Sequence, residues 1–194
     1  MNKTIDFYYD YVSATSYLAW TQLQGLCERT GACINYKPIL LGGVFKAANN
    51  ISPMTIPAKW EWFKKDLERH AAHYGIPYQL NPHFPFSSVN ALRGAFWAQA
   101  NDRLEDYNRA MFTAAWAEGK DLSSKEVLEK VLTVAGFNAA DVMEAMTQQE
   151  NKTALIEATQ AAAEQGIFGA PSMVVEGELH FGQDRLQWVE RALS

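Results

Sequence analysis

The stretch Phe7-Tyr8-Tyr9-Asp10-Tyr11-Val12-Ser13-Ala14-Thr15-Ser16-Tyr17-Leu18-Ala19-Trp20 decides the fold of this chain. Its first half predicts a strand, because Phe7 and Tyr9 alternate with more polar neighbours in an aromatic, β-prone run. Its second half predicts a helix that begins close to Ser13. A helix that follows a strand through one short turn has free backbone N–H groups at the end of the sheet, where they attract an anion or a thiolate sulfur.

Two serine hydroxyl groups lie in this turn. Ser13 and Ser16 have the spacing of a Cys-x-x-Cys redox motif, but neither position carries a thiol. Taken alone, the pattern favours two helix-capping serines, since Ser is a preferred N-cap residue. The alternative is that one hydroxyl acts in binding or catalysis, and the far end of the chain decides between the two.

The composition describes a chain that can bury a core. It has 194 residues, of which 48% are hydrophobic, which fits one domain or one domain with an insertion. The formal net charge of -5 gives no electrostatic reason to expect nucleic-acid binding. No apolar run is long enough for a membrane span, and the start at Met1-Asn2-Lys3-Thr4 lacks the pattern of a signal peptide, so we expect a cytoplasmic protein.

Cysteine and histidine residues give no metal-binding pattern. Cys27 and Cys33 are expected to be buried thiols rather than a disulfide. His70 and His73 lie on one predicted helix without a third ligand, so we interpret them as surface residues.

The order of predicted elements is β-α-β, a long helical block, then β-β-α. A helix from Ser16 to about Arg29 is followed by a strand over residues 32–39, which makes a right-handed β-α-β unit. Residues 40–43 are expected to leave the sheet, and residues 49–57 to form an irregular loop that is rich in turns. Helical spacing then continues to about residue 171, before two short strands within 172–181 and a last helix over 186–193.

This order is that of the thioredoxin fold, and a helical insertion in its middle is typical of the DsbA-like branch. We therefore predict an α/β fold in which residues 1–41 and 167–194 form the thioredoxin-like domain and residues 42–166 form the helical insertion. Gly169-Ala170-Pro171-Ser172 then occupies the place of the fold's cis-proline loop. The alternative for Pro171 is an ordinary trans proline at the start of an edge strand.

Five short motifs, in order, carry a resemblance to a known family. They are Tyr9-Asp10-x-x-Ser13-Ala14-x-Ser16-Tyr17-Leu18, Gly42-Gly43-Val44-Phe45-Lys46 with Asn49-Asn50 and Pro53, Pro57-Ala58-Lys59, Gly166-Ile167-Phe168-Gly169-Ala170-Pro171, and Phe181-Gly182-Gln183-Asp184-Arg185. Over nearly its whole length the chain resembles the 2-hydroxychromene-2-carboxylate isomerases and the kappa-class glutathione transferases. One departure is Ala14, which stands where the family has a proline that rigidifies the turn.

The resemblance implies a glutathione cofactor and a set of site residues. Ser13 is the implied catalytic residue and donates its hydroxyl to the glutathione sulfur, while Ser16 is expected to cap the helix. The implied cofactor-binding residues are Ala170 and Pro171 for the cysteinyl part, Gln183 and Asp184 for the γ-glutamyl end, and Asn50 and Lys59 for the glycyl end. The alternatives are a helix cap or an ion pair with Arg185 for Asp184, and a solvated side chain for Lys59.

The resemblance also implies a reaction and partners. It points to an isomerase in which the thiolate adds to a conjugated aromatic substrate, the former double bond rotates and the thiol leaves; a transferase that conjugates an aryl electrophile is the alternative. A thiol–disulfide oxidoreductase and a non-catalytic binding module of the same fold are less favoured. The resemblance further implies a homodimer.

The half of the site for the aromatic substrate is expected in the helical insertion. The loop over residues 81–86 and the first long helix of the insertion should shape it, and its cationic candidates for a substrate carboxylate are Lys46 and Arg93. The aromatic candidates are Trp60, Phe63, Phe84, Phe86 and Trp97, most of them expected to be core residues as well.

Overall fold

The fold, seen in a computed structural model that describes residues 3–193, is built on a four-stranded sheet. The strands are β1 (Thr4–Tyr9), β2 (Cys33–Pro38), β3 (Ser172–Val175) and β4 (Glu178–Phe181), in the order β2-β1-β3-β4. β1 pairs parallel with β2 and antiparallel with β3, and β3 pairs antiparallel with β4. Met1 and Asn2, which belong to the signal-peptide prediction, lie outside the described residues.

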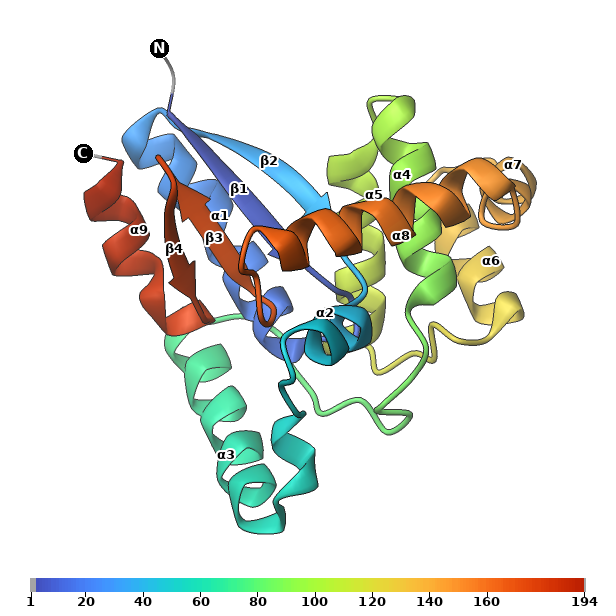
Figure 1. Ribbon diagram of the computed structural model, residues 1–194. Coiled ribbons are helices and arrows are strands. Elements are labelled where there is room, and N and C mark those ends of the chain that lie inside the picture. Colours follow the sequence, from blue (N-terminus) through green and yellow to red (C-terminus); the bar gives the residue numbers. More distant parts are fainter. Residues whose placement is uncertain (1–2, 194) are drawn as a thin grey trace.

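Helices cover both faces of this sheet and form a block beside it. α1 (Ala14–Thr30) and α9 (Leu186–Ala192) lie on one face, and α8 (Gln149–Glu164) crosses the other (Figure 1). The remaining helical segments are α2 (Leu41–Ala47), η1 (Pro53–Thr55), α3 (Pro57–Tyr74), α4 (Val89–Ala100), α5 (Leu104–Phe112), the π-helical turn η2 (Thr113–Ala117), α6 (Lys125–Val134), α7 (Ala139–Ala145) and η3 (Gln183–Arg185). The predicted thioredoxin-like α/β fold, with helices inserted between its β-α-β and β-β-α halves, is confirmed.

The alternation along β1 places its aromatic rings on opposite faces of the sheet. Phe7 and Tyr9 are fully buried on the face of α1, whereas Tyr8 packs with Val44 of α2 and Ala162 of α8 on the other. Because both faces are covered, each residue of the strand from Phe7 to Tyr9 is buried, and the strand forms the centre of the core.

The core is continuous across the predicted boundary of the insertion. The rings of Tyr9 and Phe112 lie 5.6 Å apart, and Trp116 Nε1 donates a hydrogen bond of 2.8 Å to the carbonyl oxygen of Tyr11. The division into residues 1–41 with 167–194 and residues 42–166 stays a prediction, and one core cluster contains buried residues from both parts.

One helical segment was not predicted. Residues 41–47 form α2, where the sequence predicted only that the chain leaves the sheet at residues 40–43. A Cβ atom at Gly43 would lie 2.8 Å from Thr159 Cγ2, so the missing side chain lets α2 pack closely on α8. Tertiary packing therefore stabilises a helix that its own residues do not favour.

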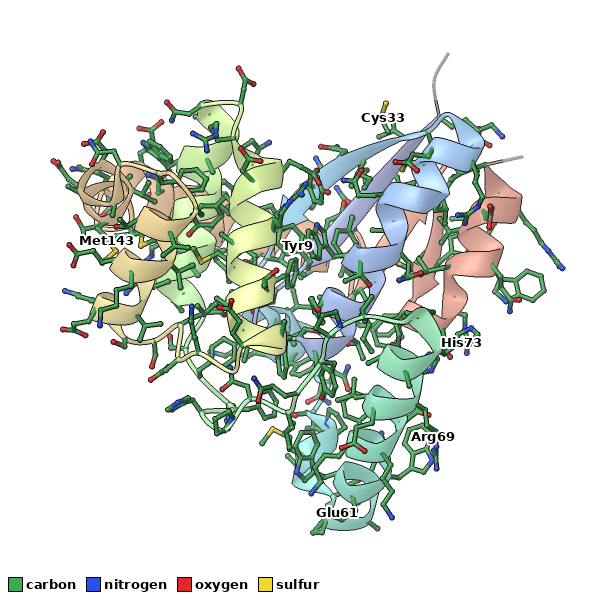
Figure 2. The ribbon with its side chains drawn as sticks, turned by 180° about the vertical axis from the view of Figure 1, so that it is seen from behind. Tyr9, Cys33, Glu61, Arg69, His73 and Met143 are labelled. Carbon is green, nitrogen blue, oxygen red and sulfur yellow. The ribbon has the colours of Figure 1, made fainter. Side chains whose placement is uncertain are left out.

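The two cysteines are free, but only one is shielded. Cys27 is half-buried on α1, whereas Cys33 is exposed at the start of β2, where Figure 2 shows its sulfur pointing away from the ribbon. The expectation of two buried thiols is therefore wrong for Cys33. Cys33 pairs with Thr4 of β1 through its backbone, and its side chain stays exposed because β2 is an edge strand.

We expect the two thiols to react at different rates. Burial raises the pKa of the Cys27 thiol to about 11, so little of it is thiolate at neutral pH, and its labelling by iodoacetamide should accelerate as the pH rises toward that value. Mass spectrometry of partly labelled protein at neutral pH should find the label on Cys33 first. Equal labelling of the two residues would contradict this assignment.

Two helical glycines should respond oppositely to alanine. A Cβ atom at Gly94 of α4 would lie 2.8 Å from Met146 Cε and clash with the Tyr107 ring, so Gly94→Ala should lower the free energy of unfolding by about 1–3 kcal/mol. Gly42 of α2 has open space around it, so Gly42→Ala should raise the free energy of unfolding by up to about 1 kcal/mol. Urea unfolding of both variants measures the contrast, and two changes of the same sign would contradict it.

Candidate active site

Ser13 is the N-cap of α1. Its backbone is extended, with φ -90° and ψ 109°, and its Oγ accepts a hydrogen bond of 3.1 Å from the backbone N–H of Ser16. Ser16 is fully buried, and its Oγ has no hydrogen-bond partner among the described residues. The capping prediction is therefore confirmed for Ser13 and wrong for Ser16.

The Ser13 hydroxyl connects the start of α1 to the cis-proline loop near the other end of the sequence. Ser13 Oγ donates a hydrogen bond of 3.1 Å to the carbonyl oxygen of Ala170, 157 positions later. The bond between Ala170 and Pro171 is cis, as predicted from its place in the fold. Thr15 Oγ1 lies 3.0 Å from Ser13 Oγ and 3.3 Å from the same carbonyl oxygen, so two hydroxyl groups share one acceptor. Thr15 was not a predicted site residue, although it lies between Ser13 and Ser16 in the same turn.

A buried carboxylate holds the turn in place. Asp10 is fully buried; its Oδ1 accepts 3.1 Å from the N–H of Val12, and its Oδ2 accepts 2.8 Å from the N–H of Leu41 at the start of α2. Burial raises the pKa of Asp10, against the effect of hydrogen bonds from Ser88, Leu41 and Val12. Since the N–H of Ser13 also donates 3.0 Å to the Asp10 carbonyl oxygen, Asp10 positions the Ser13 turn from both its side chain and its backbone. The sequence contained this residue in the motif but gave it no role.

The residue before η3, Gly182, lies next to the cis-proline loop. The N–H of Gly182 donates 3.0 Å to the carbonyl oxygen of Pro171. Gly182 has φ +105°, and a Cβ atom there would lie 2.6 Å from Asp184 Oδ1, so only glycine lets the Asp184 carboxylate fold back over this turn. Gln183 is buried, and its carbonyl oxygen accepts 3.1 Å from the Tyr74 hydroxyl.

A cavity of about 360 Å³ lies beside this turn. Gln183 and Asp184 line it together with His70, His73 and Tyr74 of α3, and Figure 2 shows His73 where the end of α3 approaches α9. The carboxylate of Asp184 forms the ion pair with Arg185, at 2.7 Å, that was one of its two alternatives. Ser13 does not line this cavity, so Gln183 and Asp184 are linked to Ser13 through the cis-proline loop and not through one continuous cavity.

The two residues predicted for the glycyl end lie in different surroundings. Asn50 Nδ2 donates 2.9 Å to the carbonyl oxygen of Phe168, two residues before Ala170, so Asn50 supports the cis-proline loop. Lys59 is exposed in the first turn of α3, and its side chain makes no hydrogen bond or ion pair with any residue from 3 to 193. The structure therefore brings Asn50 to the loop and leaves Lys59 without a contact to the other predicted residues.

Only some of the predicted aromatic residues form a group. Trp60 of α3 stacks on Phe84 at 5.4 Å, and Phe84 and Phe86 pack on Trp116 at 5.7 and 6.0 Å. Phe63 lies 6.1 Å from Trp60. Trp97 instead packs against Phe137 at 6.4 Å in the helical block, so it belongs to the core there.

Neither a metal-binding cluster nor a membrane-spanning helix is found in the part of the chain that is described. Residues 3–193 contain no cluster of three or more His, Cys, Asp or Glu side chains arranged to hold a metal ion. Over the same range, no helix has the length and apolar character needed to cross a membrane.

Comparison with known proteins agrees with the fold. The family model of the DSBA-like thioredoxin domain matches residues 4–194. A 2-hydroxychromene-2-carboxylate isomerase from Sphingobium xenophagum is 33% identical over 100% of this chain and 99% of its own length, and glutathione S-transferase kappa 1 from Homo sapiens is 27% identical over 99% of this chain and 91% of its own. The solved structure of a 2-hydroxychromene-2-carboxylate isomerase superimposes with a TM-score of 0.90 at 30% identity, covering 98% of this chain and 94% of that one. The chain therefore belongs to the DsbA-like thioredoxin family of proteins and, within it, to the enzymes that comprise the 2-hydroxychromene-2-carboxylate isomerases and the kappa-class glutathione transferases.

Proposed function

We propose that this protein is a glutathione-dependent isomerase of the 2-hydroxychromene-2-carboxylate isomerase type that acts on a conjugated aromatic substrate. The observation that carries the proposal is the Ser13 hydroxyl, which caps α1 and lies 3.1 Å from the carbonyl oxygen before the cis Pro171. A hydroxyl at this place can hold the sulfur of a thiol ligand but cannot form a disulfide with it. Relatives named as isomerases at 33 and 32% identity support this choice.

The residues around Ser13 fit a peptide that carries a thiol, a carboxylate and an ammonium group. The backbone N–H of Ala170 donates to no acceptor within residues 3–193, so it is free to pair with a peptide carbonyl. The first N–H groups of η3, at Gln183 and Asp184, have no intrahelical acceptor and suit a carboxylate. The Asp184 carboxylate, with its side chain 43% exposed, can accept from an ammonium group.

The hydroxyls of Ser13 and Thr15 are proposed to bind different groups when the ligand is present. A hydroxyl has one proton to donate, so Ser13 cannot hold both the Ala170 carbonyl oxygen and a sulfur. Thr15 Oγ1, at 3.3 Å from that oxygen, can keep the carbonyl in place while Ser13 turns its proton toward the ligand. The Ser16 N–H at 3.1 Å holds Ser13 Oγ meanwhile, and the N-terminus of α1 favours the thiolate over the thiol. Glutathione, when bound, supplies a thiolate that adds reversibly to a conjugated double bond, so that this bond can rotate before the thiol leaves.

The pocket for the aromatic substrate is proposed at the stack of Trp60 and Phe84. These side chains are half-buried, and their rings are 16° from parallel, which leaves a flat apolar surface for an aryl ring.

Cytoplasmic location and a homodimer are proposals that rest on the family.

One experiment tests the function. Purified protein is incubated with glutathione and 2-hydroxychromene-2-carboxylate, and in parallel with glutathione and 1-chloro-2,4-dinitrobenzene. We expect isomer formation without consumption of glutathione in the first reaction. A stable conjugate in the second reaction alone would favour the transferase, and reduction of insulin disulfides after removal of Cys27 and Cys33 would overturn the assignment to thiolate addition.

A further inference from the structure

A second and larger groove lies between α2, α4 and α8. Its volume is about 720 Å³, within the usual range for ligand pockets of about 300–1,000 Å³. In Figure 1, α8 crosses the front of the molecule with α2 below it and α4 beside it. None of the proposed glutathione-binding residues lines this groove, so it is a separate feature from the Ser13 site.

The floor of the groove is apolar. It contains Leu40, Val89, Leu155 and Ala163, and Ile156 of α8 is 64% exposed at its side. An exposed isoleucine next to further apolar side chains leaves a surface whose burial by a ligand is favourable. An inorganic anion would leave this surface in contact with water.

Three cations line the same groove. Lys46, Arg93 and Lys152 come from three different helices, and none of them forms an ion pair with a residue in the described range 3–193. The acid among the lining residues is Glu164, and its Oε1 already accepts 2.9 Å from Gln160 Nε2. Arg93 and Lys46 were expected to meet a substrate carboxylate, and the structure gathers them here, away from the Trp60–Phe84 stack.

Arg93 supplies the second indication of an anion. Its Nε is buried and has no hydrogen-bond partner among the residues described, and a charged donor that is buried without an acceptor costs free energy. A carboxylate oxygen beside Arg93 would satisfy this donor and gain a charge-assisted hydrogen bond.

We propose that the groove binds an amphipathic organic anion, with one carboxylate at the cations and an apolar body on the floor. A second copy of this chain is disfavoured because a two-fold contact centred on the groove would bring two sets of these three cations into one interface. The inference does not depend on the proposed isomerase activity.

The test uses decanoate, below its micelle concentration, in calorimetric titrations of the full chain. We expect one binding site, with affinity reduced at least about tenfold in Arg93→Gln and in Lys152→Gln, because each change removes a charge-assisted hydrogen bond to the carboxylate. Lys130→Gln, on the exposed side of α6, is the matched control and should bind as the wild type does. Decanol, which has the same chain without the charge, should bind at least about tenfold more weakly.

Three results would overturn the inference. The first is equal decanoate affinity in Arg93→Gln, Lys152→Gln and the control Lys130→Gln, with thermal unfolding showing that each variant is folded. If Arg93→Gln does not fold, the affinity of Lys152→Gln is compared with that of the control instead. The second is displacement of decanoate by glutathione, which would place it at the Ser13 site. The third is a concentration-dependent dimer that Ile156→Asp dissociates and decanoate does not affect, which would assign the groove to a second copy of the chain.

Discussion

Ser13→Ala is expected to lower kcat for the proposed isomerisation about 100- to 1,000-fold, the usual cost of removing one donor to a developing or stabilised anion. The same change removes the N-cap bond to the N–H of Ser16, so the free energy of unfolding should fall by about 0.5–2 kcal/mol. The ultraviolet absorbance of bound glutathione thiolate, measured with the turnover rate, separates the loss of chemistry from the loss of stability.

Ser16→Ala is the matched control. The Ser16 hydroxyl is buried without a partner among the described residues, so its removal should leave the thiolate fraction unchanged and stability equal or slightly higher. Equal thiolate fractions in Ser13→Ala and in the wild type would end the assignment of Ser13 to the sulfur. A large loss in Ser16→Ala would move that role one turn along the helix.

Asp10→Ala is expected to have the largest effect on stability, about 3–5 kcal/mol. It removes a fully buried carboxylate and leaves the N–H groups of Val12 and Leu41 without acceptors, each at a cost of about 1–3 kcal/mol. Asp106→Ala is the control, because the Asp106 carboxylate pairs with Arg103 at the surface and such pairs contribute about 0–1 kcal/mol. Urea unfolding measures both, and a loss in Asp10→Ala no larger than in the control would show that the turn is held by other contacts.

The pH dependence of stability gives an independent reading of Asp10. Its pKa in the folded protein is raised by burial above the ordinary value, so the folded state binds its proton more tightly than the unfolded state does. The stability contributed by the protonated form is then complete below the unfolded pKa and is lost as the pH rises through the folded pKa. The difference in unfolding free energy between the wild type and Asp10→Asn should therefore fall as the pH rises from about 4. A difference that rises over the same range would mean that the hydrogen bonds outweigh burial.

Local pattern determined the framework of this protein. The alternation of Phe7 and Tyr9 and the small polar residues after Asp10 predicted a strand, a turn and a helix, because strand and helix periods depend on neighbouring residues. The order of elements then predicted the fold, and the place of Pro171 before β3 predicted its cis bond. The family motifs named Ser13 and Gln183 as site residues, a prediction that the contacts of Ser13 with Ala170 support and that the experiments above test.

Tertiary structure alone decided what these residues contact. Thr15 shares the Ala170 carbonyl oxygen with Ser13 only because residues 155 to 157 positions apart meet where β1 ends and the neighbouring strand β3 begins. Asp10 accepts a hydrogen bond from the N–H of Leu41 at the start of α2, a helix that lies close against Thr159 of α8 at Gly43. Lys46, Arg93 and Lys152 line one groove because α2, α4 and α8 pack together, and no sequence spacing records that. Secondary structure follows from interactions between near neighbours, whereas side-chain partners and exposure depend on which distant segments pack against each other. The sequence by itself therefore determined the scaffold, and the packing determined the surroundings of its polar groups.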